Sequence, residues 1–161
     1  MMAVLAQLFV RARPEISGAR VPDAAAIAGL HAASFRRGWS EDEVESLLLD
    51  RSVVAHRAMA GRKLVGFILS RMAADEAEIL SVAVAASRRN RGIARQMLEL
   101  HLRRLAGLGT RSVFLEVDSG NAPARRLYQL AAFQEVGRRP GYYPQAAGPA
   151  SAALVLRRDL S

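Results

Sequence analysis

Residues 82–95 read VAVAASRRNRGIAR, which is an apolar run, a short turn dense in arginine and the start of a helical pattern. The first backbone N–H groups of a helix have no partner inside it, so they donate outward, and the helix dipole favours phosphate there. Gly92 removes the side chain where a pyrophosphate would approach the backbone, and the arginines add permanently charged, paired donors. The segment therefore predicts a site for the phosphates of a cofactor.

Two common phosphate-binding motifs are excluded. The dinucleotide fingerprint needs three spaced glycines and a later acidic residue. The nucleoside-triphosphate loop ends in Gly-Lys-Ser/Thr, whereas the only lysine of this chain is Lys63. An arginine-rich exposed turn before an ordinary helix remains the alternative interpretation. The candidate cofactor-binding residues of the segment are Val82, Ala83, Val84, Arg89, Asn90, Arg91, Gly92, Ile93, Ala94 and Arg95.

Length and composition set broad limits. The 161 residues are expected to form one domain, residues 1–161, with a core that needs no covalent staples. The absence of cysteine excludes disulfides and thiolate metal sites, and the three histidines have no metal-ligand spacing, so we expect no metal. Residues 1–10 are apolar but lack a basic leader and are too short to span a bilayer. A soluble, cytoplasmic protein without membrane contact is predicted.

The formal net charge is +8, and arginine carries almost all of the positive charge. A basic surface attracts acidic cofactors and nucleic acid alike, but a GC-rich genome would produce the same bias, and both explanations stay open. Basic and aromatic residues are not interleaved, so no direct nucleic-acid binding is predicted. We expect a monomer or a weak dimer.

The order of elements predicts an α/β (α+β) fold with a mixed sheet flanked by helices. Asp23 is expected to cap the first helix, and Ser40 with Glu43 forms a capping box for the second. Trp39, in the loop between these helices, is interpreted as a plug over the core. The expected elements are a strand at 5–13, a helix at 23–35, a helix opening at 40, strands at 52–60, 63–72 and 76–84, a helix at 92–106, a strand at 112–118, a helix at 121–131, and strands at 133–136 and 152–157.

The arginine turn carries the pattern Arg89-x-x-Gly92-x-Ala94 directly after an apolar strand. This pattern resembles the acetyl-CoA loop of the GNAT acetyltransferases, which is Gln/Arg-x-x-Gly-x-Gly/Ala. The resemblance implies an acetyl-CoA-dependent N-acetyltransferase with a single GNAT-like domain. It also implies a mixed, mostly antiparallel central sheet flanked by about four helices.

A second arrangement combines Glu116 on a strand, Asn121 at the following turn and Tyr128 in the next helix. It resembles the RimI-type branch of the family, the N-terminal acetyltransferases of ribosomal proteins, over about residues 22–158. In that branch the glutamate is the base, the asparagine contacts the cofactor and the tyrosine is the acid. The resemblance therefore implies catalytic roles for Glu116 and Tyr128 and a cofactor contact for Asn121.

Helix geometry agrees with these roles, although each residue also has a plain structural interpretation. Asn121 and Tyr128 are seven residues apart, so they share one helix face, about 10 Å apart along the axis. An ordinary helix cap and a core tyrosine are the alternatives. Glu78, on the strand that other GNAT branches use, is the rival base. We prefer Glu116 because Asn121 and Tyr128 accompany it.

Tyr142 and Tyr143 precede a proline in the loop expected between the last two strands. This feature resembles the RimI-type branch and implies that both tyrosines line the acceptor groove, while packing against the strand end is the alternative. RimI-type sequences usually carry acidic residues in the segment that follows, and this chain has none there. Ala132 stands where the family usually has glycine, so we expect a different turn, because alanine disfavours a left-handed cap.

Acetyl transfer needs only two proton transfers from the enzyme, because the amine must lose a proton and the departing thiolate must gain one. The pKa of a protein α-amine is about 8, against about 10.4 for lysine, so an α-amine needs only a modest base such as Glu116. Tyr128 would donate to the sulfur, and a backbone N–H near Val84 would meet the oxyanion, which predicts a β-bulge there. The acceptor is therefore predicted to be a protein N terminus, as in a ribosomal protein. A small amine, such as an aminoglycoside or a metabolite, and a non-catalytic acyl-CoA-binding module are the alternatives.

Overall fold

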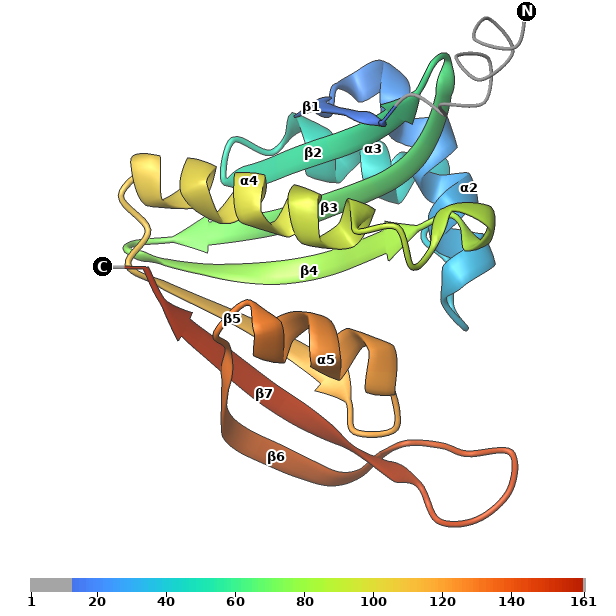
Figure 1. The fold of residues 1–161 in the computed structure, drawn as a ribbon, viewed down its shortest axis with the longest axis vertical. Coiled ribbons are helices and arrows are strands. Elements are labelled where there is room, and N and C mark those ends of the chain that lie inside the picture. The colour runs from blue at the N-terminus through green and yellow to red at the C-terminus, as the bar shows by residue number, and fades with distance from the viewer. Residues whose placement is uncertain (1–12, 161) are drawn as a thin grey trace, which may run out of the picture.

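A seven-stranded mixed sheet forms the centre of the protein, whose structure is a computed structural model that describes residues 13–160. The strand order is β1-β2-β3-β4-β5-β7-β6, and every neighbouring pair is antiparallel except β4 and β5 (Figure 1). The predicted fold class is confirmed. The strands are β1 Glu15–Gly18, β2 Val53–Ala60, β3 Lys63–Ala73, β4 Glu76–Val84, β5 Ser112–Asp118, β6 Gln134–Tyr143 and β7 Ser151–Asp159.

Helices cover both faces of the sheet, but not evenly. α4 and α5 lie on one face, over a large apolar cluster that includes Met97, Leu98 and Leu115 (Figure 1). α2 and α3 lie on the other face and pack a smaller cluster around Phe67, which sits on the half of the sheet formed by β2, β3 and β4. The helices are α2 Ala24–Ser34, α3 Glu41–Leu49, α4 Ile93–Gly107 and α5 Ala122–Leu130, with short 3-10 turns η1 Val21–Asp23 and η2 Ala86–Arg88.

The two parallel strands separate along their length. β4 and β5 pair at only three positions, from Glu76 opposite Ser112 to Glu78 opposite Phe114. Beyond these positions β4 stays paired with β3 and β5 stays paired with β7, so the sheet opens between them. We call this opening, between residues 79–84 of β4 and residues 115–118 of β5, the β4–β5 gap.

The β-bulge expected near Val84 lies elsewhere. Val84 pairs regularly with Gly66, whereas the register between β3 and β4 shifts where Leu69 faces Ser81 and Ser70 faces Ile79. Leu80 is therefore the extra residue, at the point where β4 begins to leave β5. A bulge increases the local twist of a strand, which explains why the irregularity comes at the start of the separation rather than at its end.

Both ends of the chain differ from expectation. The predicted first strand at 5–13 lies almost wholly outside the described residues, and β1 instead forms in a segment expected to be a loop. β6 continues to Tyr143 rather than ending at residue 136, so the Gly-Tyr-Tyr segment lies in a strand. Pro140 is accommodated because β6 is an edge strand with an irregular register between Arg139 and Tyr143.

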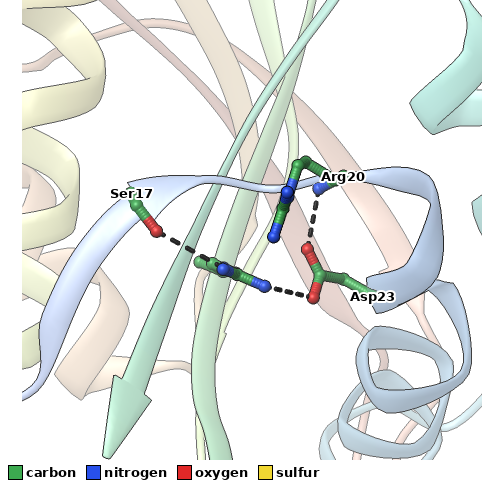
Figure 2. Close-up of polar contacts among 4 residues, drawn as sticks. Ser17, Arg20 and Asp23 are labelled. Atoms are coloured by element: carbon green, nitrogen blue, oxygen red, sulfur yellow. Dashed lines mark hydrogen bonds and ion pairs between the residues drawn. The ribbon is translucent and has the colours of Figure 1, made fainter.

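Of three turn predictions, one is confirmed, one is corrected and one is confirmed in position only. Asp23 stands at the N-cap position of α2, but its side chain makes no cap hydrogen bond. Its carboxylate instead accepts from the backbone N–H of Arg20 (2.7 Å), as Figure 2 shows, and from Arg57 Nη1 (2.6 Å). Ala132 adopts the left-handed conformation (φ 64°) despite its side chain. The capping box is present, since the Ser40 hydroxyl accepts from the Glu43 N–H at 3.1 Å.

Candidate active site

The start of α4 presents backbone donors to solvent. Gly92 precedes the helix with a φ of 78°, a left-handed conformation that favours glycine. A Cβ added to this glycine would meet no other atom within 4 Å, so the space beside it is open. The first helical hydrogen bond runs from Gln96 N–H to the Gly92 carbonyl (3.0 Å), so the N–H groups of residues 93–95 have no helical acceptor. This geometry fits a diphosphate. The start of the 15-residue helix α4 is unobstructed and faces solvent, and exposed arginines lie beside it.

The predicted cofactor-binding residues differ in what they can offer. Arg89, Asn90, Arg91 and Arg95 are exposed. Ala83, Val84 and Ile93 have buried side chains, so only their backbone can meet a ligand, and Val82 and Ala94 are half-buried. Two of the arginines already have partners. Arg89 Nε donates to the Val84 carbonyl at 3.1 Å, which ties the turn to the strand end, and Arg95 Nε pairs with Glu99 at 3.2 Å.

Glu116 lies on the face of β5 that α4 and α5 do not cover. The predicted alternation is confirmed: Val113, Leu115 and Val117 are buried in the large core cluster, while Glu116 points to the opposite side. The Glu116 side chain is 28% exposed and pairs with Arg139 Nη2 of β6 at 3.2 Å. The carboxylate is thus accessible, beside the β4–β5 gap.

Tyr128 lies on the other face of the sheet. Its ring is buried in the large core cluster and meets Phe133 edge-to-face, with 5.6 Å between ring centroids. Burial raises the pKa of the Tyr128 hydroxyl well above its ordinary value of 10, so the phenol stays protonated and carries a proton that it can donate. Glu116 and Tyr128 therefore flank β5 from opposite sides rather than lying side by side.

Asn121 caps α5, as predicted. Its Oδ1 accepts from the Ala124 N–H at 3.2 Å, and the residue is exposed. Three residues upstream, Asp118 Oδ1 accepts from the Gly120 N–H (2.8 Å) and from the Ser151 hydroxyl (2.5 Å). The turn that leads into α5 is thus bonded to the start of β7.

Tyr142 and Tyr143 gather beside Glu116. Their rings are perpendicular, with centroids 5.0 Å apart, and the guanidinium of Arg139 lies 5.7 Å from the Tyr142 ring centroid. Partial burial, and then the nearby Glu116 carboxylate, raise the pKa of the Tyr143 hydroxyl. Sequence reasoning missed Arg139, because the strand that carries it was expected to end at residue 136.

The loop between α2 and α3 borders the same end of the molecule. Arg36 Nη1 donates to the Pro144 carbonyl at 3.3 Å, which joins this loop to the segment after Tyr143. Trp39 is half-buried, stacks on His31 with ring centroids 4.1 Å apart, and donates its backbone N–H to His31 Nδ1 at 3.0 Å. This packing supports the interpretation of Trp39 as a plug over the smaller core.

Glu78, the rival base, lies where β4 and β5 are still paired and its side chain is exposed.

His56 and His101 form a buried chain with Ser70: the two Nδ1 atoms are 2.7 Å apart, and His101 Nε2 lies 2.6 Å from the Ser70 hydroxyl. Within residues 13–160, no three side chains of the usual metal-binding types gather. In the same part of the chain, no helix is long and apolar enough to cross a membrane.

Known proteins are similar to this chain in sequence. The family model of the Acetyltransferase (GNAT) family matches residues 24–133. The [ribosomal protein bS18]-alanine N-acetyltransferase of Escherichia coli is 30% identical over 117 residues, or 73% of this chain and 78% of that protein. The protein of that name from Salmonella typhimurium is 32% identical over 96 residues, which cover 60% of this chain and 65% of the relative's length.

Solved structures agree in fold. The crystal structure of the ribosomal-protein-S18-alanine N-acetyltransferase from Escherichia coli superposes with a TM-score of 0.84 at 26% identity, covering 92% of this chain and 94% of the other. Arabidopsis thaliana NAA60 in complex with acetyl-CoA superposes with a TM-score of 0.77 at 20% identity, covering 91% and 98%. The family match extends over both the arginine turn and Glu116. The chain belongs to the GNAT family of acetyl-CoA-dependent N-acetyltransferases.

Proposed function

We propose that the enzyme transfers the acetyl group of acetyl-CoA to the α-amino group of a protein N terminus, with a cytoplasmic ribosomal protein as the acceptor. One observation carries the proposal: an accessible carboxylate, Glu116, stands beside the β4–β5 gap, on the half of its sheet face that α2 and α3 leave uncovered. The likeness to bS18-alanine N-acetyltransferases supports the choice of acceptor.

Acetyl-CoA and the acceptor would bind on opposite faces of the sheet. The diphosphate of acetyl-CoA would bind the N–H groups of residues 93–95, with Gly92 and Arg91 beside it. Asn121 starts the other helix of that face and would contact the same extended molecule. The thioester then enters the β4–β5 gap. There the edge of β4 near Val84 is not paired with β5, and a backbone N–H would stabilise the oxyanion.

The acceptor approaches from the opposite face, where Tyr142 and Tyr143 form a wall beside Glu116. Glu116 takes the proton of the α-ammonium, directly or through water, and the amine attacks the thioester carbonyl. The carbon–sulfur bond breaks as the nitrogen–carbon bond forms, and Tyr128 donates a proton to the departing thiolate. The second proton of the attacking nitrogen leaves through water and returns the tyrosine to its protonated form. An α-amine is about 2.5 pKa units less basic than lysine, which corresponds to roughly 3.4 kcal/mol less work for the base.

A small-molecule amine is the second candidate acceptor. Residues 144–150, at the acceptor end, contain no acidic side chain that would attract a basic peptide. A panel separates the candidates: peptides with a free N terminus, the same peptides with a blocked N terminus but a free lysine, and small amines. We expect acetylation of the free peptides only. Turnover of small amines alone would refute the proposed acceptor.

A further inference from the structure

On the uncovered face of β5, β7 and β6, the residues that separate Glu116 from Arg139 are small. The strand register places Val155 and Gly137 in the row of Glu116, and Ala153 and Arg139 in the row of Asp118. Residues opposite each other in a sheet share one face. Glu116 and Arg139 are therefore long charged side chains in adjacent rows of this face, and they meet across Ala153 and Val155.

Arg139 has two interactions, and both are with residues proposed to act on the acceptor. Its Nη2 lies 3.2 Å from Glu116 Oε1, and its guanidinium lies 5.7 Å from the Tyr142 ring centroid. A guanidinium is planar and stays protonated, so it cannot itself take a proton from the amine. The contacts that the structure gives Arg139 therefore point to a role through the carboxylate and the tyrosine.

We propose that Arg139 is a positioning residue for the base. Its ion pair holds the Glu116 carboxylate in one orientation beside the β4–β5 gap. Its contact with Tyr142 fixes the position of that tyrosine, which is proposed to contact the acceptor, relative to the carboxylate. This inference rests on the proposed function, in which Glu116 is the base. A base that is held in place before the amine arrives needs no reorganisation during proton transfer.

The pair does not serve mainly to stabilise the fold. The Arg139 side chain is 58% exposed, and exposed ion pairs contribute little to stability. Arg138 offers a matched control on the same strand. It pairs with Glu135 at 3.0 Å, is similarly exposed, and lies in the row of Leu154, whose side chain packs on the α5 side of the sheet. It therefore faces away from Glu116.

The test is a double-mutant cycle between Arg139 and Glu116, measured as kcat and as KM for the amine that the wild type acetylates. We expect Arg139→Gln to lower kcat about tenfold while KM changes less than about twofold, because the orientation of the base is lost. Arg139→Lys keeps the charge and should stay within about threefold of the wild-type kcat. Arg138→Gln should match the wild type.

In the Glu116→Gln background, Arg139→Gln should lower kcat no further, since a positioning residue has nothing left to position. Additive losses, or an Arg139→Gln variant that changes only KM, would overturn the inference and leave the proposed base intact. A Glu116→Gln variant as active as the wild type would instead refute the base itself, and Arg139 would lose its role with it. If the wild type acetylates only small amines, the proposed acceptor fails, and the same cycle run on such an amine still decides the role of Arg139.

Discussion

Acidification should destabilise the protein through His101. This side chain lies on α4, is completely buried, and is bonded between His56 and the Ser70 hydroxyl. Burial, and then the neighbouring His56, lower the pKa of His101 from 6.5 to about 3. The native protein therefore keeps His101 neutral at every pH at which the protein is expected to work.

The sign of the effect follows from where the proton binds. Between about pH 3 and pH 6.5 the unfolded chain binds a proton at this histidine and the native protein does not, so the free energy of unfolding falls as the pH falls. From a pKa of 6.5 in the unfolded chain, the loss is about 2 kcal/mol near pH 5 relative to neutral pH. Burial also lowers the pKa values of His56 and His31, which act in the same direction.

Urea unfolding at neutral pH and near pH 5 measures this loss directly, from the shift in midpoint at constant slope. The matched variant is His101→Gln, which keeps a polar group at the position but cannot titrate. It should be less stable than the wild type at neutral pH and should lose less stability on acidification. The ordinary pKa of Asp50 and Asp159 is 3.8, below the range from about pH 5 to neutral pH over which the two measurements are made. Equal stability of the wild type at both pH values, or the same pH dependence in His101→Gln, would refute the argument.

Three further predictions concern the base, a strained turn and an ion pair. Glu116→Gln should lower kcat by about a hundredfold and Glu78→Gln by much less; steady-state kinetics that rank them the other way would move the base to Glu78. Ala132→Gly should raise the free energy of unfolding by about 0.5–1 kcal/mol in urea titrations, because it relieves a left-handed alanine, and no gain would argue against strain there. Asp23→Asn should cost about 2 kcal/mol, because it removes the negative charge that the largely buried guanidinium of Arg57 meets at 2.6 Å; a neutral result would show that the charge of the carboxylate contributes nothing to stability.

Local patterns were sufficient for much of the fold. The predicted strands at 76–84 and 112–118 match β4 and β5 residue for residue, because both alternate between buried and exposed positions. The start of α4 was found from a glycine and a change of pattern. The capping box was found because it is formed entirely by neighbours in the chain.

Features that depend on distant parts of the chain could not be predicted. Asp23 stands at the predicted N-cap position, but its carboxylate bonds to Arg57 of β2, which is 34 residues away in the chain. The length of β6 depends on its register with β7, which tolerates a proline at the sheet edge. The pairing of Arg139 with Glu116 and the separation of Glu116 from Tyr128 onto opposite faces follow from that register and from the packing of α5.

The central claim is that cofactor and acceptor meet in the β4–β5 gap from opposite faces of the sheet. A crystal structure with a conjugate of coenzyme A and an N-terminal peptide tests it most directly. We predict the diphosphate on the N–H groups of residues 93–95, the sulfur in the gap on the Tyr128 side, and the peptide on the face of Glu116 and Tyr143. A diphosphate bound away from the start of α4, or a peptide on the face covered by α4 and α5, would contradict the account.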